Sequence, residues 1–156
     1  MHKTFITKNF KETQKLGERL SKKIKTNQVI ALSGDLGSGK TTFIQGFLKG
    51  LKVKGPFTSP TFVVMKHYEK VKIPGKNSKF IKSKLQNIYH IDAYRVKSKD
   101  ILNLGWEEIT ADKNNVIIIE WADRIRRIVP DRALWIKFKW LDNNMRKLRL
   151  YESKAK

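Results

Sequence analysis

The sequence predicts a three-layer α/β sandwich with a mixed, mostly parallel sheet that ends in an antiparallel hairpin. Apolar segments of strand length, such as residues 29–33 and 116–121, are separated by segments with helical periodicity. A glycine-rich segment at residues 34–41 joins the first of these strands to the helix that follows. Residues 134–140 and 146–151 flank a turn, and the first of the two alternates cleanly between apolar and polar side chains. Alternating strands and helices favour parallel pairing, and the last two segments favour a hairpin.

Length and composition bound the class of protein. With 156 residues, of which 40% are hydrophobic, we expect a single domain over residues 1–156 with a buried core. No apolar run approaches 18 residues, which argues against a membrane span, and residues 1–11 lack the apolar core of a secretory signal. The absence of cysteine excludes disulfides, zinc on thiolates and thiol catalysis. We therefore expect a cytoplasmic protein.

The net charge of +20 has two explanations that the sequence leaves open. A basic surface attracts polyanions, and RNA, including a tRNA, is the obvious partner. The alternative is a compositional bias toward lysine, since lysine far outnumbers arginine, the residue that binds phosphate bidentately. Residues 70–84 are the densest basic segment, and we expect them to form an exposed connection between two strands.

The first predicted helix covers residues 9–25 and ends at Asn27. Asn9 is a suitable N-cap, with Glu12 three residues later as in a capping box. Apolar side chains that share one face of this helix are Phe10, Leu16, Leu20 and Ile24.

The strongest motif follows the strand at residues 29–33. The pattern G-x-x-x-x-G-K-[ST] is matched at each required position by Gly34-Asp35-Leu36-Gly37-Ser38-Gly39-Lys40-Thr41. In such a loop the backbone N–H groups surround the phosphates, Lys40 reaches the β- and γ-phosphates, and the Thr41 hydroxyl binds Mg²⁺. The motif predicts a bound nucleoside triphosphate and makes the predicted sandwich P-loop NTPase-like. The candidate nucleotide-binding residues are Asp35, Leu36, Gly37, Ser38, Gly39, Lys40, Thr41 and Thr42.

Two carboxylates stand at the ends of apolar strands. Asp92 ends the strand that begins at Asn87, and Glu120 ends the run of residues 116–119. If these strands flank the strand before the phosphate loop, both carboxylates meet near the γ-phosphate. Mg²⁺ prefers oxygen ligands, usually one or two carboxylates with phosphates and water. We expect Thr41 and Glu120 to be its protein ligands, with Asp92 holding a metal-bound water or orienting the attacking one. The predicted catalytic residues are Lys40, Asp92 and Glu120.

Three other features have a plain structural interpretation beside a functional one. The hydroxyls of Thr58, Ser59 and Thr61 resemble a switch segment, although their spacing alone favours a turn that enters a strand. His90 is expected to pack and hydrogen-bond within its strand rather than to act as a catalytic base. The arginines after residue 121 are either solvated or face a polyanion or a partner protein. They are Arg124, Arg126, Arg127 and Arg132.

Taken together, these segments resemble the TsaE (YjeE) family, the small bacterial ATPases of tRNA threonylcarbamoyladenosine modification. The resemblance covers most of the chain. It depends less on the phosphate loop, which many NTPases share, than on several motifs in a fixed order. The matching segments are Leu16-Gly17-Glu18-Arg19, residues 34–43 (GDLGSGKTTF), Gly46-Phe47-Leu48, Ser59-Pro60-Thr61-Phe62, residues 90–95 (HIDAYR) and Ile119-Glu120-Trp121.

The resemblance implies an ATPase that binds Mg²⁺ through the two ligands named above and needs Asp92 for ATP turnover. It also implies that residues 59–62 are switch-like, that Thr13 lies by the adenine and that Arg146 touches the nucleotide. Family members act with the partner proteins TsaB and TsaD. ATP hydrolysis by TsaE resets that complex between turnovers in the family's scheme, and TsaE itself is not the transferase.

Two other functions are compatible with the sequence. A small P-loop phosphotransferase would pass the γ-phosphate to a metabolite or a protein side chain, and a nucleotide-switched RNA-binding module would not need turnover. No guanine-reading N/TKxD motif is present, so ATP is favoured over GTP. Because no arginine of the motif set is an obvious arginine finger, we expect slow turnover in isolation and completion of the site by a partner.

Overall fold

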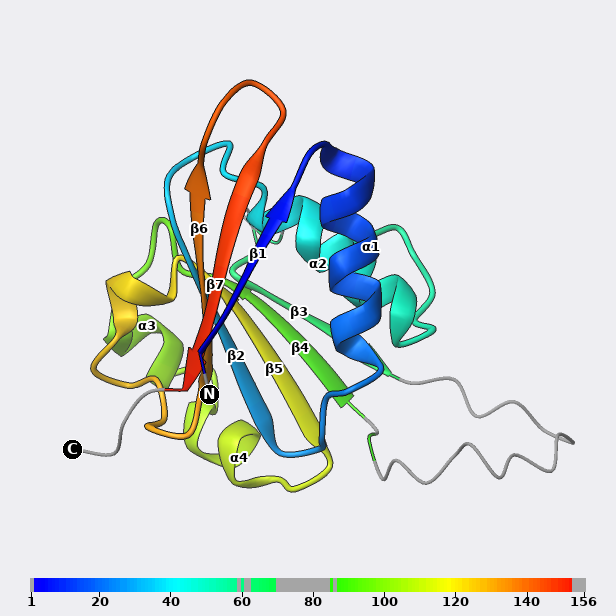
Figure 1. The fold of residues 1–156 in the computed structure, drawn as a ribbon. Coiled ribbons are helices and arrows are strands. Elements are labelled where there is room, and N and C mark those ends of the chain that lie inside the picture. Colours follow the sequence, from blue (N-terminus) through cyan, green and yellow to red (C-terminus); the bar gives the residue numbers. More distant parts are fainter. Residues whose placement is uncertain (1, 59, 61–62, 70–84, 86, 153–156) are drawn as a thin grey trace, which may run out of the picture.

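The computed structural model describes residues 2–58, 60, 63–69, 85 and 87–152, whose strands and helices are shown in Figure 1. The strands are β1 (His2–Thr7), β2 (Gln28–Ser33), β3 (Met65–Glu69), β4 (Asn87–Asp92), β5 (Asn115–Glu120), β6 (Leu134–Trp140) and β7 (Arg146–Glu152). The helices are α1 (Phe10–Ser21), α2 (Lys40–Gly50), α3 (Ser98–Leu102), α4 (Trp106–Ala111) and the 3₁₀-helix η1 (Ala122–Ile125). Within these described ranges, no helix has the length and apolar character needed to cross a membrane.

The seven strands form one mixed sheet in the order β1-β7-β6-β2-β5-β4-β3. β2 pairs in parallel with β5 on one side and with β6 on the other, and β5 pairs in parallel with β4. The pairs β1–β7, β6–β7 and β3–β4 are antiparallel. All strands except β7 and β3 therefore run in one direction, which confirms the predicted mixed, mostly parallel sheet and places β2 at its centre.

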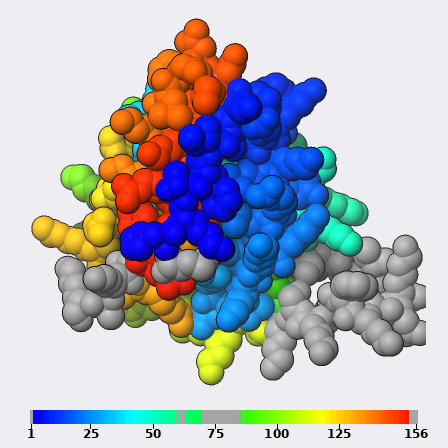
Figure 2. Space-filling view, viewed as in Figure 1, coloured from blue at the N-terminus to red at the C-terminus, as the bar shows by residue number. Residues whose placement is uncertain are grey.

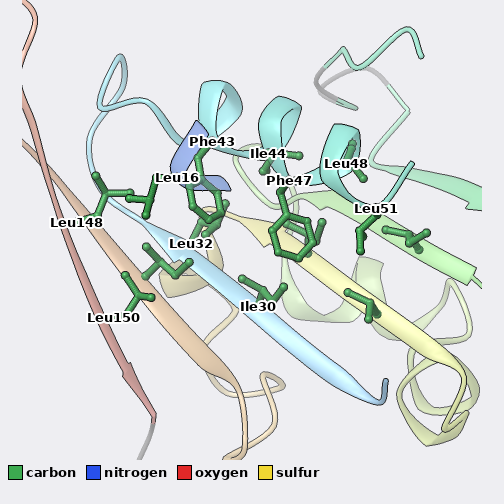
Figure 3. Packing of buried hydrophobic residues seen from close by; sticks show 14 of the residues in the cluster. Leu16, Ile30, Leu32, Phe43, Ile44, Phe47, Leu48, Leu51, Leu148 and Leu150 are labelled. Atoms are coloured by element: carbon green, nitrogen blue, oxygen red, sulfur yellow. The ribbon is translucent and has the colours of Figure 1, made fainter. Parts of the chain in front are cut away.

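Helices cover both faces of the sheet and bury two apolar clusters, which confirms the three-layer sandwich (Figure 1). Figure 3 shows Ile30 and Leu32 of β2 beneath Phe43 and Phe47 of α2, in the cluster that also includes Leu16 of α1. The alternate residues of β2 pack on the other face, against side chains of α3, α4 and η1. Both faces of β2 and β5 are buried, which explains their continuous apolar sequences.

The helices α1 and α2 cross at close range because glycines stand where they meet. A Cβ atom on Gly46 of α2 would overlap the carbonyl oxygen of Gln14 in α1, and one on Gly17 would overlap the carbonyl oxygen of Phe43. Only a residue without a side chain fits at either point. Because α2 begins at the glycine-rich loop, this crossing also fixes α1 beside that loop.

The predicted start of the first helix is confirmed, but its predicted end is wrong. The Asn9 Oδ1 atom accepts a hydrogen bond from the Glu12 N–H at 2.9 Å, and the Glu12 carboxylate accepts one from the Lys8 N–H at 2.8 Å. The helix ends at Ser21 rather than at residue 25. Asn27 lies beyond it in a left-handed conformation (φ 58°), and its N–H donates to the carbonyl of Asn115 at the start of β5. This long-range bond, which periodicity cannot indicate, directs the chain into β2.

The N-terminal strand β1 was not predicted. It lies at an edge of the sheet and, among the described strands, pairs with β7 alone, so most of its side chains are exposed. Figure 2 shows β1 and α1 in blue on the same face of the molecule as β7 in red. An edge strand with one neighbour needs little apolar alternation, and its sequence therefore lacks the pattern that indicates the central strands.

The remaining strand predictions are confirmed within a few residues. The strand expected to follow the predicted turn at residues 58–61 is β3, at Met65–Glu69, and the late segments form the antiparallel pair β6 and β7. Asp142 opens the turn between that pair, and two backbone N–H groups of the turn hold the pKa of its carboxyl below the usual value. The basic connection predicted at residues 70–84 lies outside the described residues.

The helix crossing generates a stability prediction. Gly46→Ala should lower the free energy of unfolding by about 2 kcal/mol or more, since the added methyl group displaces the backbone of α1. Lys49→Ala, at an exposed position of the same helix, should change it by less than about 0.5 kcal/mol. Urea unfolding measures both values, and equal stability of the Gly46 variant and the parent chain would contradict the close crossing.

Candidate functional site: a phosphate loop facing two strand-end carboxylates

The glycine-rich loop leaves the carboxyl end of β2 and leads into the amino end of α2. Gly34, Gly37 and Gly39 all have positive φ angles (135°, 73° and 98°), which explains why glycine recurs there. The Ser38 N–H donates to the carbonyl of Asp35 at 3.2 Å and closes the turn. In the described part of the chain, no side chain accepts a hydrogen bond from the first turn of α2 as a cap. The N–H groups of that turn can therefore donate to an anion in the loop.

The loop residues differ in exposure. Asp35, Leu36 and Gly37 form the exposed tip, with the Leu36 side chain 77% exposed, whereas Ser38 is buried beneath them. Thr41 and Thr42 lie in the first turn of α2 and are half-buried. The predicted nucleotide-binding residues 35–42 thus form one segment that runs from the exposed loop tip into the first turn of α2.

Lys40 is folded back over its own loop. Its Nζ atom donates to the carbonyl oxygens of Gly34 at 2.7 Å and Asp35 at 2.9 Å, and lies 3.7 Å from the ring centroid of Trp121. Burial lowers the pKa of the Lys40 ammonium, and nearby carboxylates, of which Glu120 has the largest effect, oppose that shift. Phosphate oxygens are stronger acceptors for an ammonium group than neutral carbonyls are. The position of Lys40 is therefore one from which it can turn to an anion in the loop.

Glu120 joins the loop helix to a neighbouring strand. The Thr41 hydroxyl donates to its Oε2 atom at 2.8 Å, and His90 of β4 lies with Nε2 2.9 Å from its Oε1 atom. Both Glu120 and His90 are nearly inaccessible, at 2% and 1% exposure. An ionised carboxylate only accepts hydrogen bonds, so the imidazole Nε2–H donates to it. Each carboxylate oxygen of Glu120 thus has a partner on a different element.

Asp92 lies beside Glu120 as predicted, although the assumed strand arrangement is wrong for one of them: β5 flanks β2, whereas β4 pairs with β5 and is not a neighbour of β2. The two residues are register partners of the parallel strands β4 and β5. The Oδ1 atom of Asp92 accepts a hydrogen bond from the Tyr94 N–H at 2.9 Å, which fixes the carboxylate at the carboxyl edge of the sheet. Asp92 is 6% exposed, and its charge is one of those that act on Lys40. The structure therefore brings together the three predicted catalytic residues.

Thr13 and Arg146, from segments without a sharp motif, also reach the loop. A Cβ atom built on Gly39 would lie 3.7 Å from the Thr13 Cγ2 atom and 3.7 Å from the Arg146 Cγ atom. The Thr13 hydroxyl is hydrogen-bonded to the hydroxyl of Thr7 at 2.8 Å, while the Arg146 guanidinium donates to carbonyl groups of the β6–β7 turn. These two residues therefore border the phosphate loop from α1 and from β7.

The oxygen donors at this edge suit a hard cation. The Thr41 hydroxyl and the Glu120 and Asp92 carboxylates all belong to it, and oxygen is the ligand atom that Mg²⁺ prefers. Across the residues with a described position, no group of three or more histidine, cysteine or acidic side chains could hold a metal ion by itself. A cation here would need phosphate and water oxygens to complete its coordination.

The proposed switch segment is described only in part. The carbonyl and hydroxyl oxygens of Thr58 both accept hydrogen bonds from the Lys66 ammonium group of β3. Ser59, Thr61 and Phe62 lie outside the described residues, so the switch-like role stays a prediction.

Sequence reasoning did not foresee two features of the site. The predicted hydrogen bond of His90 is present, but its partner, Glu120, was not identified. An aromatic pair also follows the two carboxylates: the rings of Tyr94 and Trp121 have centroids 4.7 Å apart. Lys40 lies against the Trp121 ring, and Arg124 lies against the Tyr94 ring. The available indications were the two-residue spacing of His90 and Asp92 and the aromatic residue that follows Glu120 directly.

Comparison with known proteins gives one consistent answer. Residues 7–148 match the family model described as threonylcarbamoyl adenosine biosynthesis protein TsaE. The chain is 37% identical over 151 residues to the tRNA threonylcarbamoyladenosine biosynthesis protein TsaE of Aquifex aeolicus, with 96% of each chain covered. The Rickettsia prowazekii protein of the same name is 37% identical over 138 residues, covering 87% of this chain and 85% of the relative. The crystal structure of Bacillus subtilis YdiB superimposes with a TM-score of 0.76 at 27% identity, covering 98% of this chain and 86% of that one.

The buried hydrogen bond between His90 and Glu120 generates a second stability prediction. His90→Leu should lower the free energy of unfolding by about 2 kcal/mol, because it leaves one oxygen of a buried carboxylate without its donor. The matched control is His67→Leu in β3, which removes a solvent-exposed hydrogen bond to the Asn87 side chain and a stacking contact with Tyr89, and should cost about 1 kcal/mol or less. The comparison uses urea unfolding, and similar losses in the two variants would show that the buried contact contributes nothing particular.

Proposed function

Because the chain belongs to the TsaE family of threonylcarbamoyl adenosine biosynthesis proteins, we propose that it is the Mg²⁺-dependent, ATP-hydrolysing subunit of a tRNA threonylcarbamoyladenosine-modifying system. The observation that carries the proposal is the 2.8 Å contact between the Thr41 hydroxyl and the Glu120 carboxylate at the edge of a phosphate loop. A loop used only as a structural turn would have no need to join its helix to a buried acid of a neighbouring strand.

The residues of the site can divide the work of ATP hydrolysis between them. Backbone N–H groups of residues 35–42 and the amino end of α2 bind the phosphates, and Lys40 turns from its carbonyl partners to the β- and γ-phosphates. Asp92 orients a water molecule and accepts its proton as the water oxygen attacks the γ-phosphorus. The bond between that phosphorus and the β–γ bridging oxygen breaks, and its electrons leave with ADP.

Thr41 and Glu120 would hold the metal ion. Their oxygen atoms and the neighbouring Asp92 carboxylate suit Mg²⁺, as the donor set described above indicates. When bound, Mg²⁺ supplies positive charge that neutralises the phosphate oxygens during transfer. The Thr41–Glu120 hydrogen bond holds both ligands close together beforehand, so little reorganisation of the chain is needed.

The partners proposed for this subunit are the TsaB and TsaD proteins, with ATP hydrolysis resetting their complex between rounds of tRNA modification. The proposal includes a location in the cytoplasm, where tRNA is modified. A net charge of +20 is compatible with contact between this chain and tRNA. Of Thr13 and Arg146, which flank Gly39, the first is proposed to lie by the adenine and the second to touch the nucleotide.

Two substitutions separate binding from hydrolysis. Lys40→Ala should weaken binding of a fluorescent ATP analogue by tenfold or more, a loss of roughly 1.4 kcal/mol, since it removes a charge-assisted hydrogen bond to phosphate. Glu120→Ala should reduce phosphate release by about a hundredfold while affecting nucleotide affinity much less. Glu107→Ala, an exposed acid of α4, is the control and should change neither quantity.

The same assay contains the results that would contradict the proposal. Unchanged hydrolysis in Glu120→Ala would remove that residue from the metal site. With γ-labelled ATP, label that appears in a protein or metabolite instead of free phosphate would indicate a phosphotransferase.

Turnover by the isolated chain should be slow, because no arginine finger is evident in the motif set. Addition of TsaB and TsaD should raise the rate of phosphate release in a steady-state assay. A rate of tens per second for the purified chain alone would show that the site is complete without a partner.

A further inference from the structure

A concave surface lies outside the phosphate loop, between α3 and the η1 segment that follows β5. This groove has a volume of about 1080 Å³. Its lining includes two acidic side chains, Asp123 and Asp131, and five positively charged ones. The positive side chains are Lys97, Lys99, Arg124, Arg126 and Arg127. We call this surface the arginine groove.

Lysine-rich composition does not account for the arginine groove. The chain contains 26 lysines but only eight arginines, and three of those eight line this one surface. A bias toward lysine would spread lysines over every exposed face and would not concentrate the rarer residue in one hollow. Arginine binds phosphate bidentately through its planar fork, which lysine cannot do.

The cations of the groove are also not engaged in ion pairs with any residue of the described ranges. Among the residues that the structure describes, none of the five groove cations lies within 4.0 Å of a carboxylate oxygen. The nearest acids of the lining are therefore not used as ion-pair partners. An anionic ligand would consequently meet cations that need not first give up another salt bridge.

Two of the guanidinium groups are held in place by aromatic rings. Arg126 lies 4.9 Å from the ring centroid of Trp135, and Arg124 lies 4.7 Å from that of Tyr94 while donating to the Tyr94 carbonyl at 2.6 Å. Stacked side chains lose less conformational freedom when they bind. Arg124 also borders the Tyr94–Trp121 pair against which Lys40 lies, so the groove adjoins the nucleotide site.

We propose that the arginine groove binds the sugar–phosphate backbone of RNA. Several fixed cations along one hollow match a chain of regularly spaced phosphates, and the wider positive charge of the molecule would attract the rest of a long polyanion. The inference rests on the proposed function only in the choice of tRNA as the RNA. An acidic protein segment is the competing ligand, and the experiment separates the two.

The test compares two variants with the same change in charge. The groove variant carries Lys99→Glu and Arg127→Glu. The control, or α1 variant, carries Arg19→Glu and Lys23→Glu, and so also replaces one arginine and one lysine at exposed positions. Its two residues belong to the α1 segment, on the other face of the sheet. Binding of a fluorescently labelled, unmodified tRNA transcript is followed by anisotropy at several salt concentrations. The groove variant should bind at least tenfold more weakly than the α1 variant.

Salt dependence gives the second readout. The slope of log Kd against log salt concentration should fall by about one for each phosphate that the protein no longer neutralises, hence by about two in the groove variant, and should stay unchanged in the α1 variant. Affinity for a fluorescent ATP analogue, measured on the same samples, should be equal in all three proteins. If the groove variant does not fold, Lys99→Gln/Arg127→Gln and Arg19→Gln/Lys23→Gln provide the same comparison.

Three results would overturn the inference. One is the absence of tRNA binding by the parent chain, and another is an equal loss of affinity and slope in both variants. The third is tighter, groove-dependent binding of polyglutamate than of tRNA, which would assign the groove to an acidic protein. If the chain has no ATPase activity but binds RNA through the groove, the proposed function is contradicted and the inference about the groove stands.

Discussion

The hydrogen bond between Thr41 and Glu120 is the contact on which the arrangement of the site depends. It joins residues 79 positions apart in the sequence, and it exists because β5 pairs in parallel with β2. The parallel register places the carboxyl end of β5 level with the loop that leaves β2. The second oxygen of Glu120 then meets His90 of β4, so one carboxylate connects α2 with two strands. Asp92 follows from the same register, as the neighbour of Glu120.

The sequence was a good guide wherever a residue's environment depends on its own strand. The continuous apolar run at residues 116–119 indicated a strand covered on both faces, and β5 is buried throughout. Because the ends of parallel strands meet at one edge of a sheet, Asp92 and Glu120 could be expected to converge before any contact was known. The glycines of residues 34–39 predicted the loop because their positive φ angles exclude most side chains.

Features that depend on pairing between distant segments were not accessible in this way. The strand β1 is stabilised by β7 from the other end of the chain. The chain that follows the early end of α1 is held by a hydrogen bond from Asn27 to β5. The partner of His90 likewise depends on the register of two strands. The arginine groove combines residues 96–99 with residues 123–135, and their charges alone did not distinguish a binding surface from a solvated one.

We propose above that the loop at residues 34–41 binds a triphosphate whose γ-phosphate faces Glu120. A crystal structure with Mg²⁺ and a non-hydrolysable ATP analogue would test this directly. We expect the β-phosphate inside the loop and the Lys40 Nζ atom moved from the carbonyls of Gly34 and Asp35 to phosphate oxygens. We also expect the metal ion to be bound by the Thr41 hydroxyl and the Glu120 carboxylate. A nucleotide bound elsewhere, with the Lys40 and Thr41 contacts unchanged, would contradict this proposal.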